Sequence, residues 1–159
     1  MVTVALDLGS CCGFAVASKH GITSGTLSFK KKGKFNDSGY KALYDFLRTF
    51  IEGPHEHPDL EVVVEKPHAG RFLAPIRILF GLLAIVHLFC ALFQIKLTEY
   101  SPKEIKKFAT GSGNAKKEEM VAAIQKDFPA VKDHNTADAL HMLRMHLSRK
   151  QVGNNDLPF

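Results

Sequence analysis

The sequence predicts an α/β fold in which helices flank a five-stranded mixed sheet. Near the N-terminus, three apolar or β-branched runs are separated by turns of only a few residues, which is typical of neighbouring antiparallel strands. Further along, two more strand-like runs alternate with long helical patterns. The expected strands are residues 2–7, 11–17, 23–29, 60–65 and 94–99.

Helical patterns fill the rest of the chain. The start of the third helix is the clearest, because Ser101 can cap it, Pro102 stands in its first turn and Glu104 follows the cap by three residues. The basic run Lys30–Lys34 is expected to form a solvated loop, with phosphate contact as the alternative. The expected helices are residues 38–52, 74–93, 102–110, 117–128 and 133–149.

Length, charge and cysteine content restrict the class of protein. A chain of 159 residues predicts a single domain, here residues 1–150 followed by a C-terminal tail, 151–159. The net charge of +5 and the isoelectric point near 9.1 favour an anionic partner. Three cysteines, two of them adjacent, do not resemble a disulfide framework, so we expect a reducing, cytoplasmic location.

One long apolar stretch, residues 76–93, could be mistaken for a membrane span. Its uninterrupted part, Ile78–Val86, is much shorter than the roughly 18–20 apolar residues that a spanning helix needs, and His87 follows it. We therefore expect no membrane partner. The stretch is interpreted as a helix buried on most of its faces, against the sheet and against a second subunit.

Three carboxylates, far apart in the sequence, stand at the ends of expected strands or near the start of an expected helix. Asp7 ends the first strand, Glu65 ends the fourth, and Asp138 lies in the first turns of the last helix. A buried carboxylate is costly unless something positive meets it, so Asp7 predicts a nearby metal ion or lysine. The alternative, that Asp7 only caps the turn after the strand, is about equally supported by the first strand alone.

Four segments in this order resemble the RuvC-type Holliday-junction resolvases, which belong to the RNase H-like nuclease superfamily. Together the segments span residues 3 to about 148. The resemblance implies an RNase H-like fold and a homodimer that cuts branched, four-way DNA junctions with paired symmetric nicks. The matching segments are Ala5–Ser10 with Gly13–Val16, Val62–Pro67, Ser101–Lys107 with Gly111–Lys117, and Ala137–Leu140.

The same resemblance implies a metal site and its ligands. Each subunit would hold two Mg²⁺ ions, with Mn²⁺ as a substitute, and oxygen ligands suit both ions. Asp7 would bridge the two ions, Glu65 would bind one and Asp138 the other. Two such ions activate a water molecule and stabilise the leaving oxygen at a phosphate.

The sequence departs from the family pattern at one metal ligand. The family places a carboxylate or a histidine about one helical turn before the last aspartate, where this chain has Asp133, His134 and Asn135. Residues three or four apart share a helix face, so either His134 or Asn135 could reach the metal, and imidazole is the better ligand. The alternative is that both residues only cap the helix. His141, one turn after Asp138, is expected to be a hydrogen-bonded histidine at the surface or behind the metal ligands, and the alternative is that it faces the metal site.

The resemblance also implies that basic residues of the matching segments contact DNA, and the alternative for Lys106 and Lys117, each in a lysine pair on an amphipathic helix, is that they only keep the helix surface soluble. Lys117 would assist catalysis at the cleaved strand and Lys106 would contact that strand, whereas Lys107 and Lys116 would contact phosphates. In the loop after Glu65, Arg71 would contact a phosphate.

Phe72, in the same loop, would stack on an unpaired base, or it begins the core of the following helix.

Three other interpretations remain open from the sequence. The spacing of Asp7, Gly9 and Gly13 is similar to a phosphate loop of the actin and sugar-kinase superfamily, but the chain is too short for the second lobe that such a site needs, so no nucleotide cofactor is expected. A nuclease that acts on RNA/DNA hybrids or flaps, and a non-catalytic junction-binding protein, are the other two. A viral origin would place the protein in the host cytoplasm.

Overall fold

A computed structural model describes residues 1–52, 59–67 and 73–155, with side chains of the last helix described as far as residue 151. Five strands form one mixed sheet in the order β3-β2-β1-β6-β7, which confirms the predicted fold class. The strands are β1 Val2–Asp7, β2 Cys11–Ser18, β3 Gly21–Ser28, β6 Leu60–Glu65 and β7 Lys96–Tyr100.

The register of the central strands decides where the acidic side chains lie. β1 runs antiparallel to β2 and parallel to β6, and β6 runs parallel to β7. Leu6 pairs with Val64, so Asp7 and Glu65, one residue further along each strand, end at the same edge of the sheet. The convergence of these two carboxylates, expected from the sequence, is confirmed.

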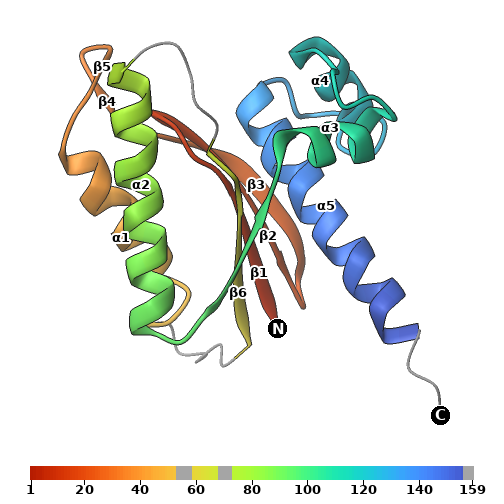
Figure 1. Ribbon diagram of the computed structural model, residues 1–159, viewed down its shortest axis with the longest axis horizontal. Coiled ribbons are helices and arrows are strands. Elements are labelled where there is room, and N and C mark those ends of the chain that lie inside the picture. The colour runs from red at the N-terminus through yellow and green to blue at the C-terminus, as the bar shows by residue number, and fades with distance from the viewer. Residues whose placement is uncertain (53–58, 68–72, 156–159) are drawn as a thin grey trace.

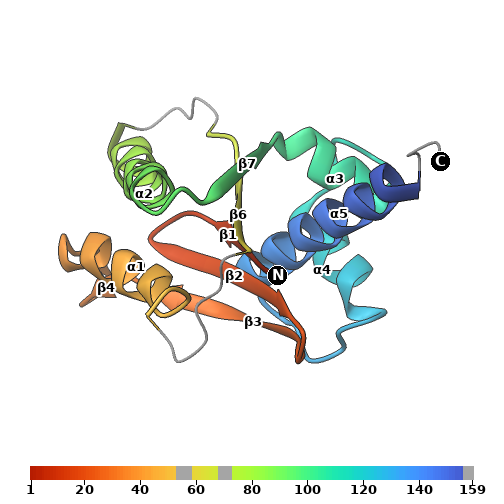
Figure 2. The same ribbon diagram turned by 90° about the horizontal axis from the view of Figure 1, so that it is seen from below.

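Helices cover both faces of the sheet (Figures 1 and 2). On one face lie α1 Ser38–Arg48 and α2 Leu73–Leu92, and on the other lie α3 Pro102–Thr110, α4 Lys117–Gln125 and α5 His134–Asn155. β1 shows how the sequence produces two cores, because Val4 and Leu6 pack in the cluster that contains α1 and α2, whereas Ala5 packs in the cluster that contains α5. Small residues on the α5 side let that helix lie close to the strands.

The element boundaries differ from the expected ones in several places. Residues 30–35 form a two-stranded hairpin, β4 Lys30–Lys31 and β5 Lys34–Phe35, rather than an irregular loop. α1 and α4 end earlier than expected. α4 ends early because the amides of both Asp127 and Phe128 bond the carbonyl of Ile124, which tightens the last turn. α5 continues to Asn155 instead of ending near Arg149.

α2 leaves an apolar face exposed. Within the described residues, α2 is the single helix long and apolar enough to cross a membrane by length and composition, with mean hydropathy 2.1. Leu82, Val86 and Phe89 are fully buried against the sheet, but only 28% of the helix is buried within this chain. The expected burial against the sheet is therefore confirmed, and the expected burial of the remaining faces against a second subunit stays a prediction.

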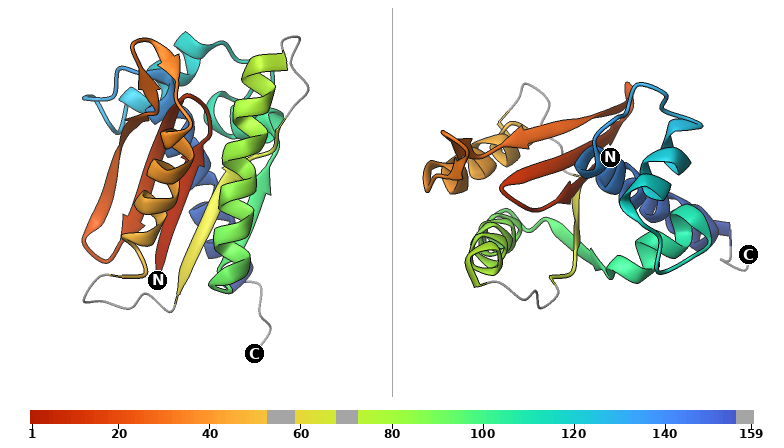
Figure 3. Two further views of the ribbon diagram at one scale, coloured as in Figure 1. Left: turned by 90° about the vertical axis from the view of Figure 1, so that its left-hand side faces the viewer. Right: turned by 90° about the horizontal axis from the view of Figure 1, so that it is seen from above.

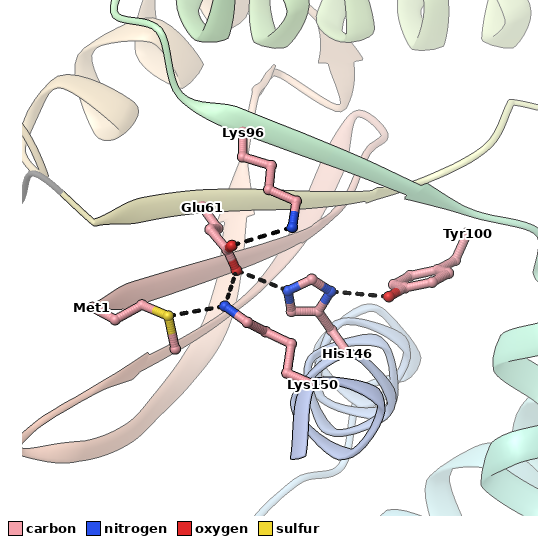
Figure 4. Close-up of polar contacts among 6 residues, drawn as sticks. All are labelled: Met1, Glu61, Lys96, Tyr100, His146 and Lys150. Atoms are coloured by element: carbon pink, nitrogen blue, oxygen red, sulfur yellow. Dashed lines mark hydrogen bonds and ion pairs between the residues drawn. The ribbon is translucent and has the colours of Figure 1, made fainter. Parts of the chain in front are cut away.

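A polar network fastens α5 to strands β6 and β7 of the sheet (Figure 4). His146 lies 3.0 Å from the Glu61 carboxylate through Nε2 and 2.9 Å from the Tyr100 hydroxyl through Nδ1. Since a carboxylate only accepts, Nε2 donates to Glu61, and Nδ1 accepts from Tyr100. Lys150 donates to the same carboxylate at 2.8 Å, and the Lys96 ammonium lies 3.6 Å from it.

The network predicts a specific acid sensitivity. Burial alone would raise the pKa of Glu61, but hydrogen bonds from Lys150 and His146 and the charges of Lys150 and Lys96 outweigh it and lower the pKa to about 2. The stabilisation is therefore present above the ordinary glutamate pKa, near 4.5, and is lost as the pH falls toward 2. We expect Glu61→Gln to lower the unfolding free energy by roughly 1.5–3 kcal/mol at pH 7. Denaturant titrations should find that this difference from wild type shrinks below pH 4.5; a difference that is independent of pH would contradict the assignment.

Candidate active site

A cleft of about 630 Å³ opens at the edge of the sheet where β1 and β6 end. Its lining brings together the three carboxylates that the sequence singles out, although Glu65 and Asp138 are 73 residues apart in the chain. Three lysines and the first residues of α5 complete the polar part of the wall. The polar lining residues are Asp7, Glu65, Lys103, Lys106, Asn114, Lys117, His134, Asn135 and Asp138.

Asp7 lies at the centre of the negative charge. Its pKa is raised well above the ordinary value, mainly by burial and further by the charges of Asp138 and Glu65, while the charge of Lys117 acts in the opposite direction. The charges of Asp138 and Glu65 act on Asp7, so the three carboxylates are close enough to repel one another. Ionised carboxylates so arranged are stabilised by any cation that binds among them.

Glu65 and Asp138 respond to the same field. Burial and the charge of Asp138 raise the pKa of Glu65 to about 7, against the effect of Lys106. Burial also raises the pKa of Asp138, and the nearby charges of His134, Lys106 and Lys117 oppose the rise. Both lysines therefore act on the carboxylates that the cleft contains.

The donor set fits a hard divalent cation. Three carboxylates that repel one another supply the oxygen ligands that Mg²⁺ and Mn²⁺ prefer, and His134 lines the same cleft as a nitrogen donor. Among the residues that the structure describes, no group of three His, Cys, Asp or Glu side chains is already close enough to hold one ion. The side chains thus share a cleft and a field without forming a closed ligand cage.

Asp133, His134 and Asn135, the three candidates for a further metal ligand, have different roles at the start of α5. Asp133 caps the helix, because its carboxylate accepts from the Thr136 amide at 2.9 Å and from the Thr26 hydroxyl of β3 at 2.8 Å. These bonds outweigh burial and lower the pKa of Asp133. His134 and Asn135 line the cleft. The capping role that the sequence left open for His134 and Asn135 therefore belongs to Asp133.

Gly13 has a role that the sequence pattern does not reveal. It pairs with Asp7 across β1 and β2, and a Cβ atom built on it would lie 2.0 Å from the carbonyl oxygen of Asn135. Only glycine therefore allows the first turn of α5 to lie against β2 at this point. The signal in the sequence, a glycine inside a strand, is consistent with close approach of another backbone but does not say which one.

The remaining predicted residues fall into three groups. Lys106 and Lys117 line the cleft, whereas Lys107 and Lys116 are exposed and do not line it. Arg71 and Phe72 lie outside the described residues, so their predicted contacts with DNA stay predictions. His141 is hydrogen-bonded as expected, donating to the Met120 carbonyl at 2.9 Å, but it is buried rather than at the surface, and it does not line the cleft.

Curated relatives of this chain share one description, crossover junction endodeoxyribonuclease RuvC. The protein of Cytophaga hutchinsonii is 30% identical over 122 residues, which are 74% of this chain and 60% of the relative. The protein of Nitratidesulfovibrio vulgaris (strain DP4) is 26% identical over 162 aligned positions, 96% of this chain and 93% of the relative. Thus the match spans less than two thirds of the first relative and nearly the whole of the second. No protein-family model matches the chain.

Solved structures support the fold independently. The structure of Thermus thermophilus RuvC in complex with a Holliday junction substrate superposes with a TM-score of 0.74 at 17% identity, over 96% of each chain. Identity this low shows the fold alone, and that fold is the RNase H-like one.

Family membership follows from the relatives. The RuvC protein of Dehalococcoides mccartyi (strain ATCC BAA-2266) is 31% identical over 118 residues, which cover 72% of this chain and 67% of that protein. With this similarity and the conserved fold, the chain belongs to the RuvC family of crossover junction endodeoxyribonucleases.

Proposed function

We propose that this protein is a metal-dependent endonuclease that resolves four-way DNA junctions by paired symmetric nicks. One observation carries the proposal: carboxylates from β1, β6 and α5 and three lysines line one cleft. The relatives with crossover junction endodeoxyribonuclease activity in their names, and the Thermus thermophilus RuvC bound to a Holliday junction substrate, support the choice of DNA substrate.

The residues of the cleft have two proposed roles, metal binding and stabilisation of charge at the phosphate. Asp7, Glu65 and Asp138, with His134 as the fourth ligand, would hold two Mg²⁺ ions per subunit, for which Mn²⁺ would substitute. When bound, these ions supply an activated water and charge stabilisation at the scissile phosphate. Lys117 offsets the negative charge that builds up on that phosphate.

Residues around the cleft position the DNA. Lys106 holds the cleaved strand from the wall of the cleft, and Lys107 and Lys116 contact phosphates outside it. Arg71 and Phe72 contact a phosphate and an unpaired base in the branch. Base stacking on an aromatic ring needs no particular sequence, which suits a protein that recognises branched structure.

A homodimer is part of the proposal, because paired nicks on a two-fold substrate need two active sites. The exposed face of α2 is the proposed interface. Leu73, Phe80, Leu88 and Leu92 are all more than half exposed and recur at helical spacing. The free thiols of all three cysteines agree with the proposed cytoplasmic location.

Phe80→Glu should convert the dimer to monomers. A buried unpaired carboxylate in the interface costs about 3 kcal/mol or more, which weakens dimerisation at least ~10²-fold. Light scattering after size-exclusion chromatography measures the mass directly. Phe108→Glu, at a similarly exposed phenylalanine on α3, is the matched control and should stay dimeric. A wild-type monomer, or a dimeric Phe80→Glu variant, would contradict the interface.

A single assay separates the proposed function from its competitors. The protein is incubated with a synthetic four-way junction, linear duplex, flap or RNA/DNA hybrid, each with Mg²⁺ or with EDTA. Symmetric nicks in the junction that need Mg²⁺ are the expected result. Preferential cutting of hybrid or flap would assign a different nuclease, and tight junction binding without cutting under Mg²⁺ or Mn²⁺ would assign a structural junction-binding protein.

A further inference from the structure

The hairpin β4–β5 concentrates positive charge on a defined scaffold. Lys30, Lys31, Lys32 and Lys34 are all exposed, and no acidic residue interrupts residues 30–36. The two strands pair through Lys30 with Phe35 and Lys31 with Lys34. Lys32 and Gly33 both have positive φ, 49° and 78°, which is the conformation of a tight hairpin turn.

Apolar contacts fix the base of the hairpin to the body of the protein. Phe29 is 6% exposed, and its amide donates to the Ser10 carbonyl at 2.9 Å. The ring of Phe35 packs edge-on against Tyr40, with centroids 5.1 Å apart. Gly39 allows this packing, because a Cβ atom there would come within 3.0 Å of both phenylalanine side chains. The lysines therefore project from an anchored element rather than from a loose loop.

The charge of the hairpin is not neutralised within the described part of the chain. None of its four lysines forms an ion pair or side-chain hydrogen bond with another described residue, and three of them line a hollow of about 690 Å³ with Asn36. Other lysines do find partners: Lys41 pairs with Asp45, and Lys150 pairs with Glu61. Four like charges in five residues repel one another unless a polyanion binds.

The hairpin lies at the catalytic end of the molecule. Ser10, to which its base is bonded, stands in the turn directly after β1, three residues beyond Asp7. Figure 1 shows the hairpin at the upper left and α3 and α4 at the upper right of the same end, and the left view of Figure 3 agrees. The hairpin thus lies at the same end of the molecule as α3 and α4, whose residues Lys103, Lys106 and Lys117 line the cleft.

We propose that the β4–β5 hairpin is a second phosphate-binding element, which grips the backbone of a duplex arm as that arm leaves the cleft. The inference rests on the proposed function and adds to it a contact remote from the reacting phosphate. Lysines bind backbone phosphates without reading sequence, so the hairpin contributes affinity and holds an arm in place but takes no part in the chemistry.

The test compares two triple variants of equal charge. Lys31, Lys32 and Lys34 are changed to Gln in one, and the exposed Lys19, Lys41 and Lys126 in the other. Each is combined with Asp7→Asn, and binding to four-way junctions with long or short arms is measured in EDTA over a range of salt concentrations. Since each phosphate contact contributes about 0.9 to the slope of log K against log salt, the hairpin variant should lose about 2–3 from the slope.

The expected result has three further parts. The hairpin variant should bind long-armed junctions at least tenfold more weakly than the control at about 0.15 M salt. It should show little loss with short arms, and recover with Arg at the three positions. Without Asp7→Asn, it should keep the kcat of wild type at saturating junction while its KM rises.

Several outcomes would overturn the inference. If the two triple variants have equal affinity and equal salt dependence, the lysines of the hairpin are only solvated and bind no DNA. Binding of both triple variants to anionic phospholipid vesicles is measured as well. If the hairpin variant loses vesicle binding but binds junctions as well as the control does, the hairpin is a membrane-binding surface. A lower kcat at saturating junction would place the hairpin in the chemistry. If wild-type protein cuts no junction, the proposed function fails, but the binding comparison still decides whether the hairpin holds duplex DNA.

Discussion

Replacing Asp7 with asparagine should abolish junction cleavage and, in the same protein without metal, raise thermal stability. Loss of one preorganised electrostatic group alone costs 10²–10³-fold in rate, and a residue proposed to bridge two ions should cost about 10³-fold or more. The stability gain has a separate cause. Burial and the charges of Asp138 and Glu65 raise the pKa of Asp7, so its ionised form destabilises the folded state at neutral pH.

Two measurements on one variant check both halves of this prediction. Single-turnover cleavage with Mg²⁺ should fall, while the melting temperature in EDTA should rise by about 2–4 °C for each kcal/mol gained. Asp127→Asn is the matched control, since Asp127 is exposed and pairs with Arg144 at 2.7 Å. It should cut like wild type and gain no stability. An Asp7→Asn protein that still cuts would remove Asp7 from the active site, and one that melts lower would show that its charge stabilises the fold.

The arrangement of the carboxylates was predictable because it follows from local rules. Strands that are parallel neighbours end at the same edge, so Asp7 and Glu65 had to converge once β1 and β6 were recognised. The cap at Ser101 and Glu104 also forms as expected, with both bonds of the capping box present. In each case the information lies within a few residues or in a simple pairing rule.

Features that depend on distant partners were not predictable in the same way. α2 is apolar nearly all round, so its sequence cannot say which face the sheet covers and which face it leaves exposed. The β4–β5 hairpin was predicted as a loop, because two residue pairs are too few to give an alternating pattern and lysine is not typical of strands. Asp133 accepts from the nearby Thr136 amide, but also from the Thr26 hydroxyl, on a strand more than a hundred residues earlier, and no local pattern gives that second contact.

Gly13→Ala should lower kcat for junction cleavage by about 10²-fold while leaving junction affinity nearly unchanged. The added methyl group would lie 2.0 Å from the carbonyl oxygen and 2.3 Å from the carbonyl carbon of Asn135, so the first turn of α5 must move away from β2. That turn carries His134, Asp138 follows one turn later, and Asp7 lies directly across from Gly13. A displacement of about 1 Å between reacting groups is enough for such a loss.

The affinity should persist because Lys106 and Lys117 are on α3 and α4, which the added methyl group does not touch. Overpacking also costs about 1–3 kcal/mol of stability, so kcat is measured well below the melting temperature of the variant. Gly25→Ala on the adjacent strand is the matched control, since its Cβ would meet only the ring of Phe14, at 3.1 Å. It should lose stability without losing kcat. If both variants lose kcat in proportion to stability, Gly13 serves the fold; if Gly13→Ala alone loses it, the close approach of α5 to β2 sets the distance between Asp7 and Asp138 on which cleavage depends.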